Sequence, residues 1–371
     1  MAVVPIARRH MNREGAKVAE YIAFKAEALA TFAPLRFICA PLLAYADCGG
    51  GVSNPAKADQ PEPLLLVVGP TASGKSRLGL EVAEALGAEI ISADAFAVYR
   101  GLDIGTDKPD AEARIRVRHH LIDVADPTEV FSAGAFVEAA TAAIGEIRSR
   151  GITPIVVGGT HFWIRALLLG LFPSPPRDPE RTARLAATWD RDPAAVFRRL
   201  EEIDLAAAAR IGPRDRQRIL RAIEVFEATG TPISEHWSFH RPPRDFDPVL
   251  IAPERPRAEL YAKIDTRVDR MFSSGLREEV QRILASGVPV EAHALKAIGY
   301  RQLVRFFQDD CDLESAIHHT KAASRKLAKR QLTWLRGLTE GKLRWLPPAE
   351  SGGTEAAIRL WSETLRGRRQ R

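Results

Sequence analysis

A glycine-rich loop constrains this chain more than any other stretch. The loop has the spacing G-x-x-x-x-G-K-S/T and comprises Gly69, Pro70, Thr71, Ala72, Ser73, Gly74, Lys75 and Ser76. The apolar run Leu64–Val68 precedes it and a helical pattern over Arg77–Leu86 follows it. Glycines let backbone N–H groups turn inward around an anion, and the helix directs its positive end to the same place. The loop therefore predicts a diphosphate or polyphosphate site, with a charge from Lys75 and Mg²⁺ on the Ser76 hydroxyl.

The residues around the loop alternate between strand and helix patterns. Short apolar strands are expected at Glu89–Ser92, His120–Val124 and Pro154–Val157, with a long helix over Ala133–Arg150. Such alternation is typical of a parallel sheet with crossover helices. From Pro173 to Glu235 the pattern is helical throughout, which indicates an insertion.

The sheet is expected to resume after this insertion. We predict a strand at Val249–Ala252, helices from Arg257 to Arg336 and a last short strand at Leu343–Leu346. The predicted fold class is α/β: a P-loop parallel sheet core with a helical insertion domain and a helical C-terminal part. The predicted boundaries are 61–172 for the first part of the core, 173–245 for the insertion, 246–348 for the return strand and C-terminal helices, and 349–371 for a basic tail, whose end Arg366–Arg371 is expected to be disordered.

Residues 1–60 differ in composition from the rest and receive no function. This extension is alanine-rich over Val18–Ala46 and ends in a glycine-rich linker. Arginines near its start suggest a transit peptide, but several glutamates argue against one. We expect either a disordered tail or a translation start that has been assigned too far upstream. The three cysteines form no C-x-x-C motif, so a reducing cytoplasm is expected, and no apolar run is long enough for a membrane span.

Positive charge is concentrated in two helical segments. The formal net charge is +6, and one cluster lies within Arg214–Arg221 of the insertion. The second cluster lies near Trp334 and comprises Lys321, Arg325, Lys326, Lys329, Arg330 and Arg336. Like charges at i,i+4 spacing repel one another unless an anion or carboxylates neutralise them. The clusters favour binding to a phosphate backbone, and solvated helix faces are the alternative.

Two strand ends place polar residues at the same edge of the predicted sheet as the loop. Asp94 follows the second strand and could act as a general base, a magnesium ligand or a helix cap. Thr160 follows Gly158 and Gly159, which permit close approach of another group or simply a tight turn. The polar loop Asp103–Pro109 is either functional or a surface connection.

These segments together closely resemble the bacterial tRNA dimethylallyltransferases. The resemblance runs in order from about Leu64 to Leu346 and leaves out the first 60 residues. The motifs that carry it are Gly69–Ser76, Ile91–Asp94, Val98–Pro109, His119–Asp123, Pro154–Thr160, Gln217–Val225, Ala297–Arg301 and Lys326–Trp334.

The resemblance implies transfer of a dimethylallyl group from dimethylallyl diphosphate to N6 of adenosine 37 in tRNA. The loop Gly69–Ser76 and Arg267 would then hold the donor diphosphate with Mg²⁺, Asp94 would be the catalytic base, and Thr160 would contact the acceptor. The enzyme would act as a monomer on the anticodon stem-loop. The implied tRNA contacts are Asp94, Ala95, Phe96, Ala97, Thr160, Thr182, Gln217, Arg218, Ile219, Leu220, Arg221, Lys296, Ala297, Ile298, Gly299, Tyr300 and Arg301.

The sequence departs from the family pattern at several of these positions. The family usually has Ser-x-Gln after the base aspartate, where this chain has Ala95, Phe96 and Ala97. His161 and Trp163 replace a small residue and a tyrosine. Arg216 replaces a frequent proline, and Thr182 occupies a usual arginine position with Arg181 adjacent. These changes concern local tRNA contacts and leave the reaction type intact.

Three other functions fit parts of the pattern. A small-molecule kinase also joins a phosphate loop to a strand-end aspartate, but it would leave the basic clusters unexplained. A nucleic-acid-binding NTPase would bind RNA in an ATP-dependent way with no covalent product. A transferase of free adenine nucleotides would accept AMP and ignore RNA stem-loops.

Overall fold

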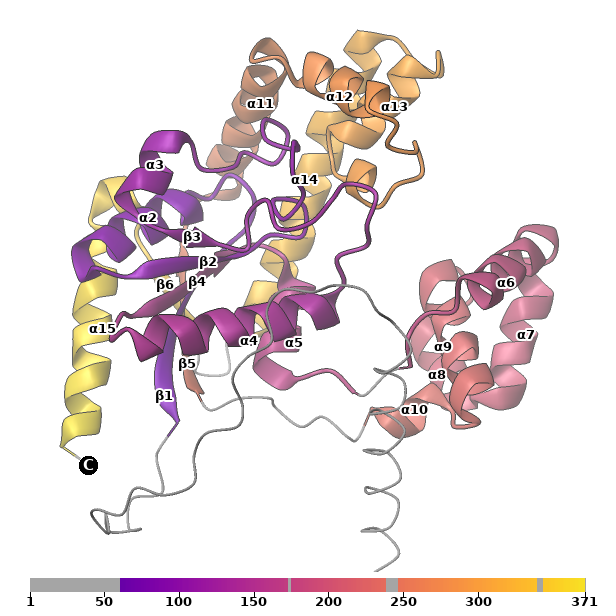
Figure 1. The fold of residues 1–371 in the computed structure, drawn as a ribbon, viewed down its shortest axis with the longest axis horizontal. Helices are drawn as coiled ribbons and strands as arrows, with labels where there is room; N and C mark the ends of the chain where they lie inside the picture. Colours follow the sequence, from indigo (N-terminus) through magenta and orange to yellow (C-terminus); the bar gives the residue numbers. More distant parts are fainter. Residues whose placement is uncertain (1–60, 173–174, 238–245, 339–342, 371) are drawn as a thin grey trace, which may run out of the picture. The chain divides into compact units, whose positions relative to one another are not determined.

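The computed structural model describes residues 61–172, 175–237, 246–338 and 343–370 (Figure 1). The predicted N-terminal extension, residues 1–60, lies outside the described residues. Every fold and site statement below concerns the described part of the chain.

A six-stranded parallel sheet forms the core. Its strands lie in the order β3-β2-β4-β1-β5-β6, so β4 separates β1 from β2. Leu66 of β1 stands in register with Val156 of β4 and with Leu250 of β5. The strands are β1 (Glu62–Val68), β2 (Glu89–Ala93), β3 (His119–His120), β4 (Pro154–Gly158), β5 (Phe246–Pro253) and β6 (Leu343–Leu346).

Both faces of the sheet are covered, which explains why β1 is apolar at every central position. Leu64, Leu66 and Val68 belong to the same buried cluster as residues of α4 (Ala133–Ser149) and α5 (His161–Leu169). Leu65 and Val67 belong to a second cluster, with α2 (Lys75–Leu86) and α15 (Gly353–Arg369). Alternate residues of a strand face opposite sides, so one apolar run supplies both cores.

The C-terminal segment is a folded helix that extends to Arg369, so the disorder expected for Arg366–Arg371 is not observed over Arg366–Arg369. Trp361 and Ala357 of α15 are 4% and 0% exposed, and they pack in the cluster that contains α2. A short 3-10 turn, η2 (Ala349–Ser351), connects β6 to this helix. The composition of the last six residues is basic, but the apolar residues before them anchor the helix on the sheet.

The third strand is shorter than predicted. It spans only His119–His120, whereas a strand over His120–Val124 was expected. Leu121 and Asp123 have φ of 60°, the left-handed region, which interrupts a strand. Asp123 instead accepts a 2.5 Å contact from the Lys108 ammonium, so this segment holds the polar loop that precedes α3 (Ala111–Arg116).

The insertion is a small bundle with its own hydrophobic core. Leu200, Ile219 and Ile223 are fully buried in it. Aspartate side chains cap four of its helices, as is favoured at helix N-termini. The helices are α6 (Pro179–Arg191), α7 (Pro193–Ile203), α8 (Leu205–Ile211), α9 (Arg216–Thr229) and α10 (Ile233–His236).

The helices after β5 lie next to the functional edge of the sheet. The 25-residue helix α14 (Leu313–Gly337) packs against α11 (Arg257–Ser273), with Leu260, Ile264 and Ala328 buried between them. Between these two come α12 (Leu276–Ala285), the 3-10 turn η1 (Ala294–Lys296) and α13 (Tyr300–Phe307). No helix in the described ranges has the length and apolarity to cross a membrane.

Candidate functional site: an anion cradle beside a carboxylate

The glycine-rich loop forms a cradle at the end of β1. Ala72 and Gly74 have φ of 62° and 93°, and Ser73 N–H donates to the Pro70 carbonyl at 3.3 Å. A Cβ at Gly69 would lie 2.7 Å from Ser73 Oγ, so a larger residue there would force the Ser73 side chain to move. Ser73 is 1% exposed, and its hydroxyl has no hydrogen-bond partner among the described residues. Helix α2 begins at Lys75, so its positive end faces the loop, as an anion site requires.

Two cations converge on this cradle. Lys75 Nζ lies 3.4 Å from the Pro70 carbonyl oxygen. Burial, and after it the nearby Arg267 guanidinium, lower the pKa of Lys75 to about 8. Arg267 comes from α11, where it donates to the Thr71 hydroxyl and pairs with Asp107 at 3.3 Å. Two neighbouring positive groups of this kind favour an anion that both can contact.

Arg255, two residues beyond the end of β5, supports the cradle. Its Nε donates to the Ser73 carbonyl at 2.7 Å, and its guanidinium also pairs with Glu259 and Glu350. The side chain is only 6% exposed. Sequence reasoning missed this residue, because only the pairing of β1 with β5 brings it next to the loop.

Asp94 stands at the same sheet edge as the cradle, as the strand order predicts. Its Oδ1 accepts hydrogen bonds from Phe96 N–H at 2.9 Å and Ala97 N–H at 3.2 Å. This oxygen therefore caps a turn at residues 95–98, whereas the predicted alternative was the cap of a helix, and no helix begins at this position. Oδ2 has no hydrogen-bond partner among the described residues, and the carboxylate raises the pKa of Lys75, so the two groups interact.

The end of β4 connects Asp94 to the cradle. Thr160 Oγ1 accepts from Ala95 N–H at 3.0 Å, and Thr160 N–H donates to the Ala93 carbonyl at 3.2 Å. A Cβ at Gly158 would lie 2.3 Å from the Ala93 oxygen, so this glycine allows the strands to meet. The Thr160 side chain thus orients the turn that carries Asp94.

Gln331 of α14 also reaches this edge. Its Oε1 accepts from Thr71 N–H at 2.9 Å, and its Nε2 donates to the Gly159 carbonyl at 2.7 Å. The residue lies within the predicted Lys326–Trp334 motif, but sequence reasoning assigned it no role.

The polar loop between β2 and α3 is held by a buried carboxylate. Glu279, 2% exposed, accepts from the N–H groups of Asp103 at 3.1 Å and Ile104 at 2.9 Å. Tyr300 donates to the same carboxylate at 2.5 Å, and burial raises the pKa of Tyr300 above its usual range. This network places Asp107, at φ 56°, against Arg267. The loop is thus connected to the cradle through an ion pair.

Several residues predicted to touch tRNA have buried side chains. Their side chains offer little surface to RNA in this structure, and their contacts with tRNA remain predictions. In the insertion, Ile219 and Leu220 are 0% and 7% exposed and belong to the helical core. The remaining buried positions are Ala97, Ala297, Gly299 and Tyr300.

Other predicted contacts do reach the surface. Gln217, Arg218, Lys296 and Arg301 are exposed, and Ala95, Phe96 and Ile298 are half-buried. Their contacts with tRNA remain predictions.

Thr182 and Arg221 take part in a polar network inside the insertion. Thr182 Oγ1 donates to Glu224 at 2.7 Å, and Arg221 contacts the same carboxylate at 3.2 Å. Glu224 is 4% exposed, so these partners satisfy a buried charge. The two side chains have a structural function here, whether or not RNA also touches them.

The basic cluster on α14 divides into paired and unpaired cations. Lys321 pairs with Asp269 of α11 at 2.6 Å, and Arg325 pairs with Asp265. The exposed cations Lys326, Lys329 and Arg330 have no ion-pair partner in the described part of the chain. We call these three residues the α14 basic face.

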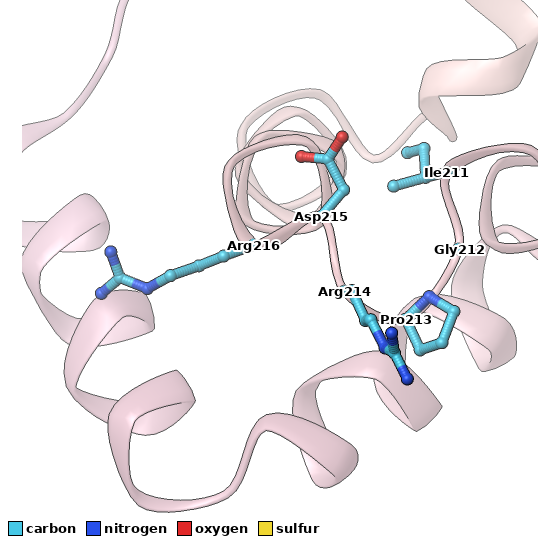
Figure 2. A pocket seen from close by; sticks show the side chains of 6 residues that line it. All are labelled: Ile211, Gly212, Pro213, Arg214, Asp215 and Arg216. Atoms are coloured by element: carbon cyan, nitrogen blue, oxygen red, sulfur yellow. The ribbon is translucent and has the colours of Figure 1, made fainter. Parts of the chain in front are cut away.

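The other basic cluster borders a shallow hollow in the insertion (Figure 2). The hollow has a volume of about 460 Å³, and Arg214 and Arg216 point in different directions around it. Arg216 pairs with Asp190 at 3.2 Å, and Asp215 caps α9. The lining residues are Ile211, Gly212, Pro213, Arg214, Asp215 and Arg216. The one carboxylate in this lining, Asp215, accepts a hydrogen bond from Arg218 N–H at 3.2 Å as the cap of α9.

Ser76 has the position expected of a magnesium ligand in a phosphate loop. It is exposed in the first turn of α2, directly after Lys75. One protein hydroxyl plus diphosphate oxygens and water is a typical Mg²⁺ environment. The described residues contain no group of three or more His, Cys, Asp or Glu side chains that could hold a metal by themselves.

The parallel sheet, the anion cradle and the strand-end carboxylate define a P-loop protein of the α/β class. The family model described as IPP transferase matches residues 97–338, and the chain belongs to this family. It is 43% identical over 312 residues to the tRNA dimethylallyltransferase of Thermomicrobium roseum, covering 84% of this chain and 91% of that one. It is 45% identical over 287 residues to that of Anaeromyxobacter dehalogenans, covering 77% and 95%.

Solved structures agree with this assignment. The full-length tRNA isopentenylpyrophosphate transferase of Bacillus halodurans superposes with a TM-score of 0.60 at 34% identity, over 81% of this chain and 96% of that chain. The corresponding transferase of Staphylococcus epidermidis gives 0.59 at 33% identity, over 83% and 100%. The fold class predicted from sequence is confirmed.

Proposed function

We propose that this chain transfers the dimethylallyl group of dimethylallyl diphosphate to N6 of adenosine 37 in tRNA and releases diphosphate. One observation carries the proposal: Asp94 and the Lys75 cradle lie at one sheet edge and interact electrostatically. The relatives support the proposal as well, because proteins named tRNA dimethylallyltransferase are 43–45% identical to this chain over most of its length.

The cradle binds the donor diphosphate. The loop amides, the α2 N-terminus, Lys75 and Arg267 stabilise the negative charge that grows on oxygen as the C–O bond breaks. Mg²⁺ bound through Ser76 would supply further charge neutralisation. Diphosphate leaves with the electron pair of the broken bond, while a bond forms between the allylic carbon and N6.

Asp94 takes the proton that N6 must lose. The adenine lone pair is delocalised into the ring, so removal of this proton as the bond forms assists the reaction. Oδ1 is held by two backbone N–H groups, which leaves Oδ2 to accept the proton. Thr160 fixes the turn that carries this carboxylate through its bond to Ala95.

The tRNA is held by positive charge on the helical parts of the chain. The α14 basic face supplies three exposed cations on the helix that also reaches the cradle through Gln331. Arg218 of the insertion is 72% exposed. Because the base must approach Asp94, adenosine 37 has to leave the anticodon-loop stack, as in other enzymes that act on a base.

The test uses purified protein, Mg²⁺, dimethylallyl diphosphate and an anticodon stem-loop RNA. Nucleoside mass spectrometry should find N6-(dimethylallyl)adenosine, and a matched RNA with guanosine at position 37 should stay unmodified. Phosphoryl transfer from ATP, or alkylation of AMP with the stem-loop ignored, would instead favour a kinase or a free-nucleotide transferase.

A further inference from the structure

We infer that Gln331 is a positioning residue that sets the spacing between the anion cradle and the acceptor side of the site. Its carboxamide bonds both sides at once, at 2.9 Å to Thr71 N–H and 2.7 Å to the Gly159 carbonyl. The inference rests on the proposed function, because it concerns the alignment of donor and acceptor.

The two partners allow only one orientation of the amide. Thr71 N–H can only donate, and the Gly159 carbonyl can only accept, so Oε1 must face the cradle and Nε2 the end of β4. A glutamate would have the same shape, but its carboxylate could not donate to Gly159. The side chain is 6% exposed, so water cannot easily replace either bond.

The space around Gly159 shows how closely the two sides meet. A Cβ there would lie 2.8 Å from Gln331 Nε2, 3.0 Å from the Gly69 carbonyl oxygen and 3.2 Å from Lys75 Cε. The end of β4 therefore touches the cradle directly, and Gln331 is bonded to both at this contact.

This placement links the leaving group to the base. The cradle holds the diphosphate, and Gly159 is followed by Thr160, whose side chain bonds the turn of Asp94. A displacement of either side changes the distance between the allylic carbon and N6. Misplacement by about 1 Å can cost about 100-fold in rate, so one buried amide can control the reaction without contacting either substrate.

The experiment compares Gln331→Met and Gln331→Glu with the matched control Gln302→Met. Gln302 is another buried glutamine, 7% exposed, whose Oε1 accepts from Gly299 N–H at 2.8 Å, but it has no contact with the cradle. The readouts are the melting temperature, tRNA affinity, kcat and KM for dimethylallyl diphosphate, and the affinity for inorganic diphosphate with Mg²⁺ by calorimetry.

We expect both Gln331 variants to lower kcat at least tenfold while tRNA affinity stays within twofold. Gln302→Met should lower the melting temperature with kcat within twofold of the parent. If Gln331→Met does not fold, Gln331→Glu carries the comparison, since it is isosteric. A folded Gln331 variant with kcat within twofold of the parent would overturn the inference.

The diphosphate measurement separates this inference from the proposed function. If the parent protein alkylates no RNA, the proposed function fails, yet inorganic diphosphate binding can still be compared. Binding at least fivefold weaker in the Gln331 variants than in Gln302→Met would support the positioning role. If the parent shows no transfer activity and all variants bind inorganic diphosphate equally well, the positioning role of Gln331 is refuted.

Discussion

The pKa of Lys75 makes the pH dependence of donor capture a direct test of the cradle. Burial and the neighbouring Arg267 lower this pKa from 10.5 to about 8. The ammonium is therefore charged below pH 8 and loses its charge as the pH rises through that value. The charged fraction falls from about 90% at pH 7 to about 10% at pH 9, whereas with an ordinary lysine it would remain above about 95%.

We therefore expect kcat/KM for dimethylallyl diphosphate to fall about tenfold between pH 7 and pH 9, because kcat/KM reports ionisation of the free enzyme. The donor diphosphate keeps its charge over this range, since its last ionisation lies near pH 6. Initial rates with saturating stem-loop RNA and constant free Mg²⁺ measure the profile.

Lys75→Arg is the informative variant, because a guanidinium stays charged throughout this range. This variant should be less active at every pH, since a planar guanidinium does not fit the position of the compact lysine ammonium. Its kcat/KM should nevertheless show no fall near pH 8. A parent profile that stays flat to pH 9, or the same fall in Lys75→Arg, would refute the reasoning.

Three further predictions follow from other contacts. Asp94→Asn should lower kcat at least about 100-fold with tRNA affinity within twofold in a filter-binding assay; an equal loss of binding would contradict its role as base. Lys329→Ala combined with Arg330→Ala should reduce the salt dependence of tRNA binding. The slope of log K against log salt concentration should become shallower by about 1 for each phosphate that is no longer neutralised. An unchanged slope would mean that the RNA does not contact these two cations. Arg150 holds the pKa of Glu89 down to about 2. The ionised Glu89 carboxylate, held by Arg150 and then by His120, should therefore stabilise the fold above pH 4.5 by up to about 3 kcal/mol, reduced by solvent screening at the partly exposed Arg150. This contribution disappears as the pH falls toward 2. Glu89→Gln should be less stable at pH 7 and show a flatter melting profile in acid; a parallel profile would contradict it.

Local patterns in the sequence were sufficient to predict most elements of the core. Five of the six strands lie where their apolar runs indicated, because a strand buried on both faces has to be apolar along its length. The segment after His120 deviates, since Leu121 and Asp123 adopt a left-handed backbone that a run of strand-forming residues does not reveal. The end of the chain deviates for a different reason. Its basic residues suggested disorder, whereas Trp361 packs against the sheet.

The tRNA-contact segments show a similar limit. A motif marks a stretch of residues, but it does not say which of them face outward. Lys296 and Arg301 are exposed, while Ala297 and Tyr300 between them are buried, and Tyr300 supports the polar loop that pairs with the cradle. Burial depends on which other element covers the helix, and that is a property of the packed fold.

The sequence by itself determined the anion cradle and the parallel sheet, because these depend on neighbouring residues and on periodicity along the chain. The reaction class came from the resemblance of its motifs to a known family. Only the tertiary structure decided what completes the cradle. Gln331 reaches Thr71 across 260 residues of sequence, and Arg255 reaches Ser73 across 182. Such contacts exist because β5 pairs with β1 and because Gln331 of α14 reaches the residues that follow β1 and β4. No local pattern contains that information.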